Sequence, residues 1–385
     1  MLIQFLFDIT GHQIFDSRLV RAGLAAVLAA LLVFLTMPHY IAFLKKIGAT
    51  SDFKDNSPPI MGGLLLVVIV LIVSCTAAIF NGYSIAALAI LVLYSGVGTI
   101  DDIAKILKKR HVESGKMSKK DYEEKADGIS STLRLFLYFL FSFAIACFCY
   151  LYIPNLTGEL YVPFVKPDIW YPHLPRFAFI IFITFVVAAS ANGTNFTDGI
   201  DTLASVPIIT GMFFVGIVAY VSGNAEFSKY LHIPYLRGCD ELFPIAMASI
   251  GALLAYLWYN SPPAEIYMGD AGSIGFGALL GIMFVLVQAG LFLPIVCIII
   301  LVEAMSVALQ IGHFKFNKIR RGREYASGHR LFLRAPIHHH FQLKWKGRSS
   351  FGDSKPLVNA KIAWRMHLVS VFALILGFIV FFGLR

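Results

Sequence analysis

Long apolar runs follow one another along most of the chain, separated by shorter polar segments. Ten of them approach the roughly 20 residues that an α-helix needs to cross a bilayer. They lie near residues 19–37, 60–80, 84–101, 133–153, 175–192, 203–222, 243–259, 271–288, 290–311 and 363–384. Because the runs are continuous rather than alternating, they argue against a transmembrane β-barrel. The pattern predicts an all-α polytopic membrane protein with about ten transmembrane helices, in a single integral-membrane domain of residues 1–385.

Composition and charge support this architecture and give it a direction. Hydrophobic residues make up 58% of the chain and charged residues 14%, whereas soluble domains contain about 25% charged residues. If both termini lie outside, the inner segments 38–59, 101–134 and 313–365 hold three, nine and thirteen of the 32 Lys and Arg residues. Cytoplasmic loops are rich in Lys and Arg, so both termini are expected in the periplasm.

The basic charge has two interpretations. Topology alone accounts for most of the net charge of +9. The alternative is a surface for anionic lipid or for a phosphorylated substrate. No nucleic-acid partner is expected in either case.

Two other kinds of segment are not expected. The first seventeen residues contain Asp8 and Asp16 but no Lys or Arg, so they do not resemble a cleaved signal peptide. The five cysteines show neither the spacing of a metal site nor that of a redox motif.

Polar residues collect at the predicted cytoplasmic ends of the spans, and the outer loops carry no comparable group. The four clusters are Asp101–Asp102 at the end of the third run, SANGTNFTDGIDTLAS (190–205), YNSPPAEIYMGDAGS (259–273) and RAPIHHHFQ (334–342). Since chance would scatter such clusters over both faces, they predict a site on the cytoplasmic face.

The acidic clusters favour a cation. Adjacent carboxylates such as Asp101 and Asp102 repel each other, and acids at a helix C-terminus oppose the macrodipole. Asp198 and Asp201 would share one face if a helix begins there, although Thr197 or Asp198 could also be a simple N-cap. Asp270 is flanked by Gly269 and Gly272 before a predicted helix, whose first N–H groups could hold a phosphate. The plainer interpretation of this last segment is a loop.

The three histidines 338–340 leave three interpretations open: phosphate contacts, a zinc site or a solvated loop. No HxxxH or Cys partner accompanies them, so phosphate contacts fit better beside a basic loop. Carboxylates, Mg²⁺ and phosphates commonly occur together, and the combination suggests phosphoryl transfer at the membrane surface. The sequence has no GxxxxGK[ST] loop and no kinase signature.

At these residues the chain resembles the phospho-N-acetylmuramoyl-pentapeptide transferase family, within the polyprenyl-phosphate N-acetylhexosamine-1-phosphate transferase superfamily. Six segments carry the resemblance, which covers nearly the whole chain. They are PIMGG (59–63), DDIAK (101–105), NGTNFTDGID (192–201), NSPPAEIYMGDAGS (260–273), EAMSVALQ (303–310) and APIHHHF (335–341). The APIHHHF form is typical of the muramoyl-pentapeptide branch.

The resemblance implies a bacterial inner-membrane enzyme with ten transmembrane helices and a cleft on the cytoplasmic face, often a homodimer. It would transfer phospho-MurNAc-pentapeptide from UDP-MurNAc-pentapeptide to undecaprenyl phosphate in the bilayer, giving lipid I and UMP, with Mg²⁺ as cofactor. This is the first membrane step of peptidoglycan synthesis.

The resemblance also implies roles for individual residues. Asp101 would deprotonate or position the lipid phosphate, and Asp102 would support it. Asp270 and Asp198 would be catalytic and hold the Mg²⁺. The substrate-binding residues implied are Asn192, Asn195, Asp201, Asn260, Lys105, Arg134, Gln310, His338, His339 and His340, with Gln310 on the uridine side and His340 supporting its loop.

Several alternatives stay open at this point. The reaction could be a direct displacement or pass through a phospho-enzyme. A sibling transferase that uses UDP-GlcNAc would share the acidic clusters, and a secondary transporter would instead place acids near helix centres. Arg134 stands where the family has Lys, and residues 111–127 and 317–328 look longer than usual, either as solvated loops or as docking surfaces.

Overall fold

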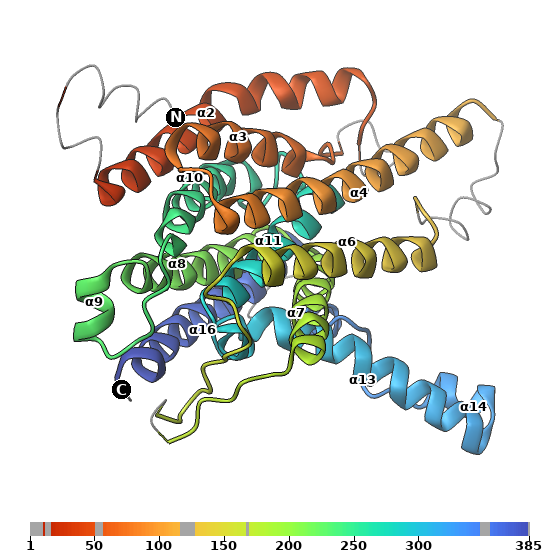
Figure 1. Cartoon of the computed structure of the whole chain (residues 1–385). Coiled ribbons are helices and arrows are strands. Elements are labelled where there is room, and N and C mark those ends of the chain that lie inside the picture. Colours follow the sequence, from red (N-terminus) through yellow and green to blue (C-terminus); the bar gives the residue numbers. More distant parts are fainter. Residues whose placement is uncertain are drawn as a thin grey trace.

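A computed structural model describes residues 11, 17–50, 57–115, 128–166, 169–346 and 355–383. Apart from two isolated β-bridges, the regular structure of these residues is helical (Figure 1). The helices are α2 (Arg18–Lys46), α3 (Gly62–Ala77), α4 (Gly82–Glu113), α6 (Ser131–Tyr152), α7 (Arg176–Thr197), α8 (Ser205–Ser222), α9 (Ala225–Tyr230), η2 (Cys239–Glu241), α10 (Leu242–Asn260), α11 (Asp270–Leu286), η3 (Gly290–Phe292), α12 (Leu293–Val296), α13 (Ile298–Arg321), α14 (Arg323–Gly328), α15 (Ile337–Trp345) and α16 (Lys355–Gly383).

Eight helices among the described residues are long and apolar enough to cross a membrane. The prediction of a polytopic all-α membrane protein is thereby confirmed. The count of ten depends on two shorter apolar helices, α3 with 16 residues and α11 with 17. At 1.5 Å per residue each extends about 25 Å, slightly less than the roughly 30 Å hydrocarbon core.

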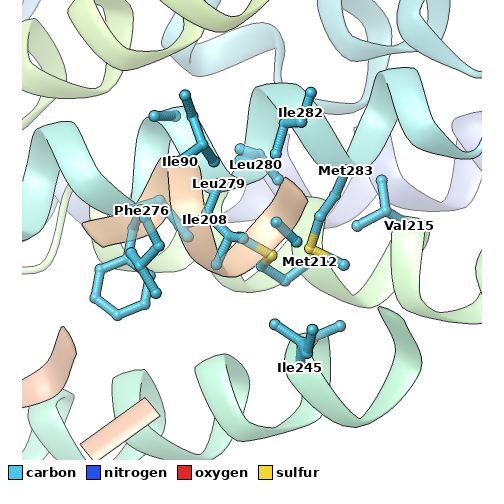
Figure 2. Close-up of a cluster of buried hydrophobic side chains, with 14 of the residues drawn as sticks. Ile90, Ile208, Met212, Val215, Ile245, Phe276, Leu279, Leu280, Ile282 and Met283 are labelled. Carbon is cyan, nitrogen blue, oxygen red and sulfur yellow. The ribbon is translucent and has the colours of Figure 1, made fainter. Parts of the chain in front are cut away.

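Helix α11 lies at the centre of the bundle, and this position explains why a short helix suffices there. All of its residues from Ala271 to Leu286 are buried, mainly against α4 and α7. Figure 2 shows its apolar side chains packed against neighbours from α4, α8 and α10. The labelled side chains are Ile90, Ile208, Met212, Val215, Ile245, Phe276, Leu279, Leu280, Ile282 and Met283. A helix that is apolar on all sides and surrounded by other helices is held by packing rather than by lipid.

Two of the expected spans differ most from the helices of the structure. The third was expected to end at residue 101, but α4 continues to Glu113. Asp101 and Asp102 therefore lie inside a helix, and the expectation that they oppose the macrodipole of a helix end was wrong. The cause is the DDIAKILKK segment, whose Ile103, Ile106 and Leu107 continue a helical pattern after the carboxylates.

The ninth span, expected as one run over 290–311, is broken at Cys297 between α12 and α13. The backbone N–H of Cys297 still donates to the carbonyl of Leu293, and its own carbonyl accepts from the N–H of Leu301. Because the bend leaves these groups paired, it needs no polar side chain, and the sequence remains apolar across it. In Figure 1, α13 extends away from the other helices and ends at α14.

Three segments expected as loops or as a helix start also differ. Residues 317–328 are largely helical in α13 and α14, and the histidines 338–340 belong to α15. No helix begins at Asp198, which instead follows the last residue of α7 and is succeeded by turns up to Ser205. Residues 116–127, and with them most of the long segment 111–127, lie outside the described residues, as do Asp8 and Asp16.

A buried ion pair joins helix ends at the side of the bundle opposite the polar clusters predicted from the sequence. The guanidinium of Arg21 on α2 donates to both carboxylate oxygens of Glu241, at 2.7 and 2.9 Å, and to the carbonyl of Ala77. Glu241 also accepts the backbone N–H of Ile79 at 2.7 Å. The pair therefore ties together the start of α2, the α3–α4 connection and the start of α10. Beside it, Arg18 pairs with Asp240.

We expect Arg21→Met to destabilise the protein by roughly 3–5 kcal/mol, because it leaves the buried Glu241 without a counter-charge. Thermal unfolding of the purified protein would measure this. Lys45→Met, at the exposed far end of the same helix, is the matched control and should change stability by less than about 1 kcal/mol. Equal melting temperatures for the two variants would contradict the assignment.

Candidate active site

Residues from four helices converge on one pair of carboxylates. The ammonium of Lys105 lies 2.8 Å from Asp101 and 2.9 Å from Asp270. The guanidinium of Arg134, near the start of α6, lies 3.5 and 3.3 Å from the same two carboxylates. Asn195, near the end of α7, donates to the other oxygen of Asp270 at 3.0 Å. The structure thus brings together five of the predicted residues from segments that are far apart in the sequence.

Asp102 fixes the position of α11. Its two carboxylate oxygens accept the backbone N–H groups of Asp270 (3.2 Å) and Ala271 (3.1 Å), which are the first two of that helix. A negative charge at a helix N-terminus satisfies unpaired donors and complements the macrodipole. The expectation that these N–H groups might hold a phosphate is therefore wrong, since Asp102 already occupies them.

Close approach of two helices makes this capping possible. A Cβ atom on Gly98, about one turn before Asp101 on α4, would collide with the backbone carbonyl of Asp270. Only a glycine lets α4 pass so near to the start of α11. The small residue therefore sets the distance between the DD pair and Asp270.

Asp101 is fully buried and its oxygens are well supplied with donors. One oxygen accepts the backbone N–H of Ile129 at 2.7 Å, and the other faces Lys105 and Arg134. An isolated buried carboxylate would be very unfavourable, and these donors offset that cost. The geometry places Asp101 as the anchor of the two cations.

Two adjoining cavities open beside this cluster and share Asp198 and Tyr267 in their walls. The smaller, about 270 Å³, is lined by Thr50, Ile60, Asp102, Lys105, Ile106, Lys109, Asp198, Tyr267, Gly269 and Asp270. The larger, about 580 Å³, is lined by Asp198, Gly199, Ile200, Asp201, Asn260, Tyr267, Arg334, His339, Gln342, Leu343, Lys346, Val358 and Asn359.

Asp198 stands at the junction of the two cavities. Packing around its carboxyl and the negative charges of Asp270, Asp102 and Asp201 together raise its pKa to about 7. A cation bound beside this carboxyl would favour its ionised form and lower its pKa again.

The same junction is built from backbone contacts. Asp201 accepts the backbone N–H of Ala264 at 3.3 Å. Asn260 accepts the N–H of Thr202 at 2.8 Å and donates to the carbonyl of Ile266 at 2.9 Å. Both residues line the larger cavity, but Asn260 chiefly holds the 198–204 turn against the 261–269 segment.

The histidines divide into different roles. His338 is buried, and its Nδ1 lies 3.0 Å from Glu303 on α13. A Cβ atom on Gly199 would collide with its ring at Nε2, so a glycine is required where the ring meets the 198–201 turn. His339 faces the larger cavity, and partial burial lowers its pKa, so that its ring is neutral at pH 7. His340 accepts the backbone N–H of Leu333 and thus supports the preceding segment.

Two of the predicted residues that line neither cavity form contacts outside the carboxylate cluster. Asn192 donates to the carbonyl of Ala188 within α7. Gln310 accepts the backbone N–H of Phe332 and so fastens the 329–336 segment to α13.

Sequence reasoning missed several residues of the site. Glu303 was signalled by its position, since an acid within an apolar run is costly unless it has a partner. Arg334, Gln342, Lys346 and Asn359 also line the larger cavity. Arg334 and Gln342 belong to the RAPIHHHFQ cluster but were not named as site residues, and nothing in the spacing of Lys346 and Asn359 marks them.

The donor set fits a hard divalent cation shared with a ligand rather than a metal centre formed by protein alone. Within the described residues, no three His, Cys, Asp or Glu side chains converge as a metal site. Mg²⁺ is usually held by one or two carboxylates together with substrate phosphates. Asp198 and Asp270, which line the smaller cavity, meet that requirement.

Comparison with known proteins agrees with this geometry. Residues 83–288, from α4 to just past the end of α11, match glycosyl transferase family 4. The phospho-N-acetylmuramoyl-pentapeptide-transferase of a Nitratiruptor species is 34% identical over 380 residues, 96% of this chain and 97% of that protein. The protein of the same name from Campylobacter curvus is 34% identical over 384 residues, 97% of each chain. The chain belongs to the phospho-N-acetylmuramoyl-pentapeptide transferases of glycosyl transferase family 4.

Membership of this family covers both halves of the site. The glycosyl transferase family 4 match contains the DD pair, Arg134 and Asp270, which lie around the smaller cavity. The α15 wall of the larger cavity lies beyond residue 288 but within the near full-length similarity to the phospho-N-acetylmuramoyl-pentapeptide transferases.

We expect Asp102→Asn to lower the free energy of unfolding by about 1–3 kcal/mol, and with it the melting temperature. The reason is that an amide offers one acceptor oxygen where two N–H groups need partners. Thermal unfolding measures the loss. Asp201→Asn is the comparison: its carboxylate accepts the N–H of Ala264, a bond that an amide oxygen can keep, so this variant should unfold closer to wild type. If the two melt alike, Asp102 does not have the structural role assigned to it.

Proposed function

We propose that this chain transfers phospho-MurNAc-pentapeptide from UDP-MurNAc-pentapeptide to undecaprenyl phosphate, giving lipid I and UMP. One observation carries the proposal: Lys105 and Arg134 lie between the buried Asp101 and the partly buried Asp270, beside a cavity that adjoins a larger, polar one. These two cations suit two phosphates, and the larger cavity suits the rest of a nucleotide donor. The names of the relatives supply the identity of donor and acceptor.

The proposed setting is the bacterial inner membrane, crossed ten times, with both termini in the periplasm and the site on the cytoplasmic face. Contacts between helix ends support alternating crossings. The start of α2, the α3–α4 connection and the start of α10 meet at Arg21 and Glu241, whereas the starts of α11 and α15 and the end of α7 meet around Asp198. A homodimer is part of the proposal and rests on the family resemblance.

Mg²⁺ is the proposed cofactor, held by Asp270 and Asp198. When bound, it would polarise the diphosphate and stabilise the charge on the departing UMP. Asp101 is a poorer candidate because it lines neither cavity, and Asp102 because its two oxygens accept backbone N–H groups of α11. The donors that face Asp270 are side chains, which can turn aside for a cation.

The chain's own residues then position the reaction. Lys105 and Arg134 neutralise the approaching phosphates, which would otherwise repel each other. A lipid phosphate oxygen forms a bond to the sugar-linked phosphorus, and the bond from that phosphorus to the oxygen of UMP breaks. Because a phosphate oxygen is already anionic, Asp101 need only hold the two cations in place. We therefore favour direct displacement over a phospho-enzyme.

We expect UMP release by the purified protein with undecaprenyl phosphate to require Mg²⁺ and to fall at least about 100-fold in Asp270→Asn. Chelation with EDTA should abolish release, and added Mg²⁺ should restore it. Glu226→Gln, an exposed acid of α9, is the control and should retain full activity.

The outcomes of this assay separate the candidate functions. Release from UDP-GlcNAc but not from UDP-MurNAc-pentapeptide would assign the chain to the sibling transferases. No release from either donor by folded wild type would overturn the proposed function. Full activity in EDTA would overturn only the cofactor.

The proposed orientation has its own test. A cysteine replacing Lys318, exposed near the end of α13, should be shielded from a membrane-impermeant maleimide in intact spheroplasts and react after lysis. A cysteine replacing Lys166, exposed in the connection between α6 and α7, should react before lysis. The reverse pattern would invert the topology.

A further inference from the structure

One face of α15 forms a wall of the larger cavity, and the kind of side chain on this face changes along the helix. His339, Gln342, Leu343 and Lys346 all line the cavity, at the i, i+3, i+4, i+7 spacing of one helical face. The N-terminal end of this face lies against the 198–201 turn, since the ring of His338 meets Gly199 there. Lys346 follows His339 by seven residues, about 10 Å further along the axis.

The wall of the cavity carries two cations. Arg334, from the segment before α15, lies near His339, and Lys346 follows the other end of the helix. Within the described residues, neither side chain forms an ion pair with a carboxylate. Between them lies an amide relay: Oε1 of Gln342 lies 2.7 Å from Nδ1 of His339, and the amide N–H of Gln342 donates to Asn359 of α16 at 2.7 Å. The relay orders this wall and offers amide groups to a ligand.

The diphosphate of the donor is not the natural partner of these two cations. It must reach Lys105, which lines the smaller cavity, and Arg134, which shares Asp270 with it, so that the lipid phosphate can meet it there. The larger cavity joins that region only through Asp198 and Tyr267. Lys346 is separated from this junction by the length of α15. The cations therefore suit a second anionic group on the same donor.

We propose that Arg334 and Lys346 bind carboxylates of the donor's peptide and so select a donor that carries an anionic peptide. The proposal rests on the proposed function, which makes the donor UDP-MurNAc-pentapeptide. The peptide would extend along α15, with its amides beside Gln342 and Asn359 and its carboxylates beside the two cations. A guanidinium or an ammonium recognises a carboxylate through charge-assisted hydrogen bonds.

The test is a steady-state comparison of two donors. UMP release would be measured with UDP-MurNAc-pentapeptide and with the same donor in which the peptide carboxylates are carboxamides. We expect Arg334→Gln and Lys346→Gln each to raise KM for the anionic donor about threefold, and the double variant about tenfold, with kcat unchanged. The amidated donor should already show the raised KM with wild type and should be insensitive to the variants.

Two controls keep the result interpretable. Lys344→Gln removes an exposed charge from the same helix that does not line the cavity, and it should leave KM unchanged for both donors. Arg334→Lys keeps the charge and should stay near wild type. Thermal unfolding of each variant establishes that it is folded.

The outcomes divide cleanly. An equal rise in KM for both donors would mean that the cations act on the diphosphate, and an unchanged KM would mean that they bind no part of the donor; either overturns the peptide-carboxylate assignment while the proposed function stands. Absence of UMP release from wild type with the anionic donor would overturn both.

Discussion

The site depends on one interaction, the capping of α11 by the carboxylate of Asp102. The first two N–H groups of α11 donate to this side chain, so these two hydrogen bonds fix the position of the start of α11 relative to α4. Asp270 is the first residue of that helix, so the same contact places its carboxylate against Lys105 and Arg134. The remaining length of α11 is buried among its neighbours and keeps the cap from shifting.

Adjacent carboxylates in a membrane helix are tolerated here because each has a different partner. Asp102 is compensated by backbone donors and Asp101 by two cations and one N–H group. Neither depends on a bound metal ion for its place in the fold. Asp198, which lines both cavities, has no such partners among the described residues. A cation that binds there with a ligand would supply the missing compensation.

The sequence predicted the helical membrane fold and the members of the acidic cluster, because both leave strong marks: uninterrupted apolar runs, and carboxylates where apolar residues would be expected. The continuation of α4 past Asp101 was not predicted, because two adjacent carboxylates after an apolar run were interpreted as the end of a helix, although Ile103, Ile106 and Leu107 continue its pattern. The bend at Cys297 leaves no polar mark at all. The α15 wall was predicted in part, through His339 and the 334–342 cluster. Lys346 and Asn359 are common surface residues, and only folding places them on a cavity.

The two interpretations of the basic charge can now be separated residue by residue. Lys318, Arg320 and Arg321 are exposed along the end of α13, outside the walls of both cavities, and fit the bias of cytoplasmic segments towards Lys and Arg. Lys105 and Arg134 pair with Asp101 and Asp270 inside the protein, so their place is explained by the site rather than by the side of the membrane. Arg334 and Lys346 are exposed, as the α13 residues are, but they line a cavity, as Lys105 does. Neither membrane topology nor an internal ion pair explains cations that line a cavity without a carboxylate partner. Their natural counterpart is an anionic group of the substrate.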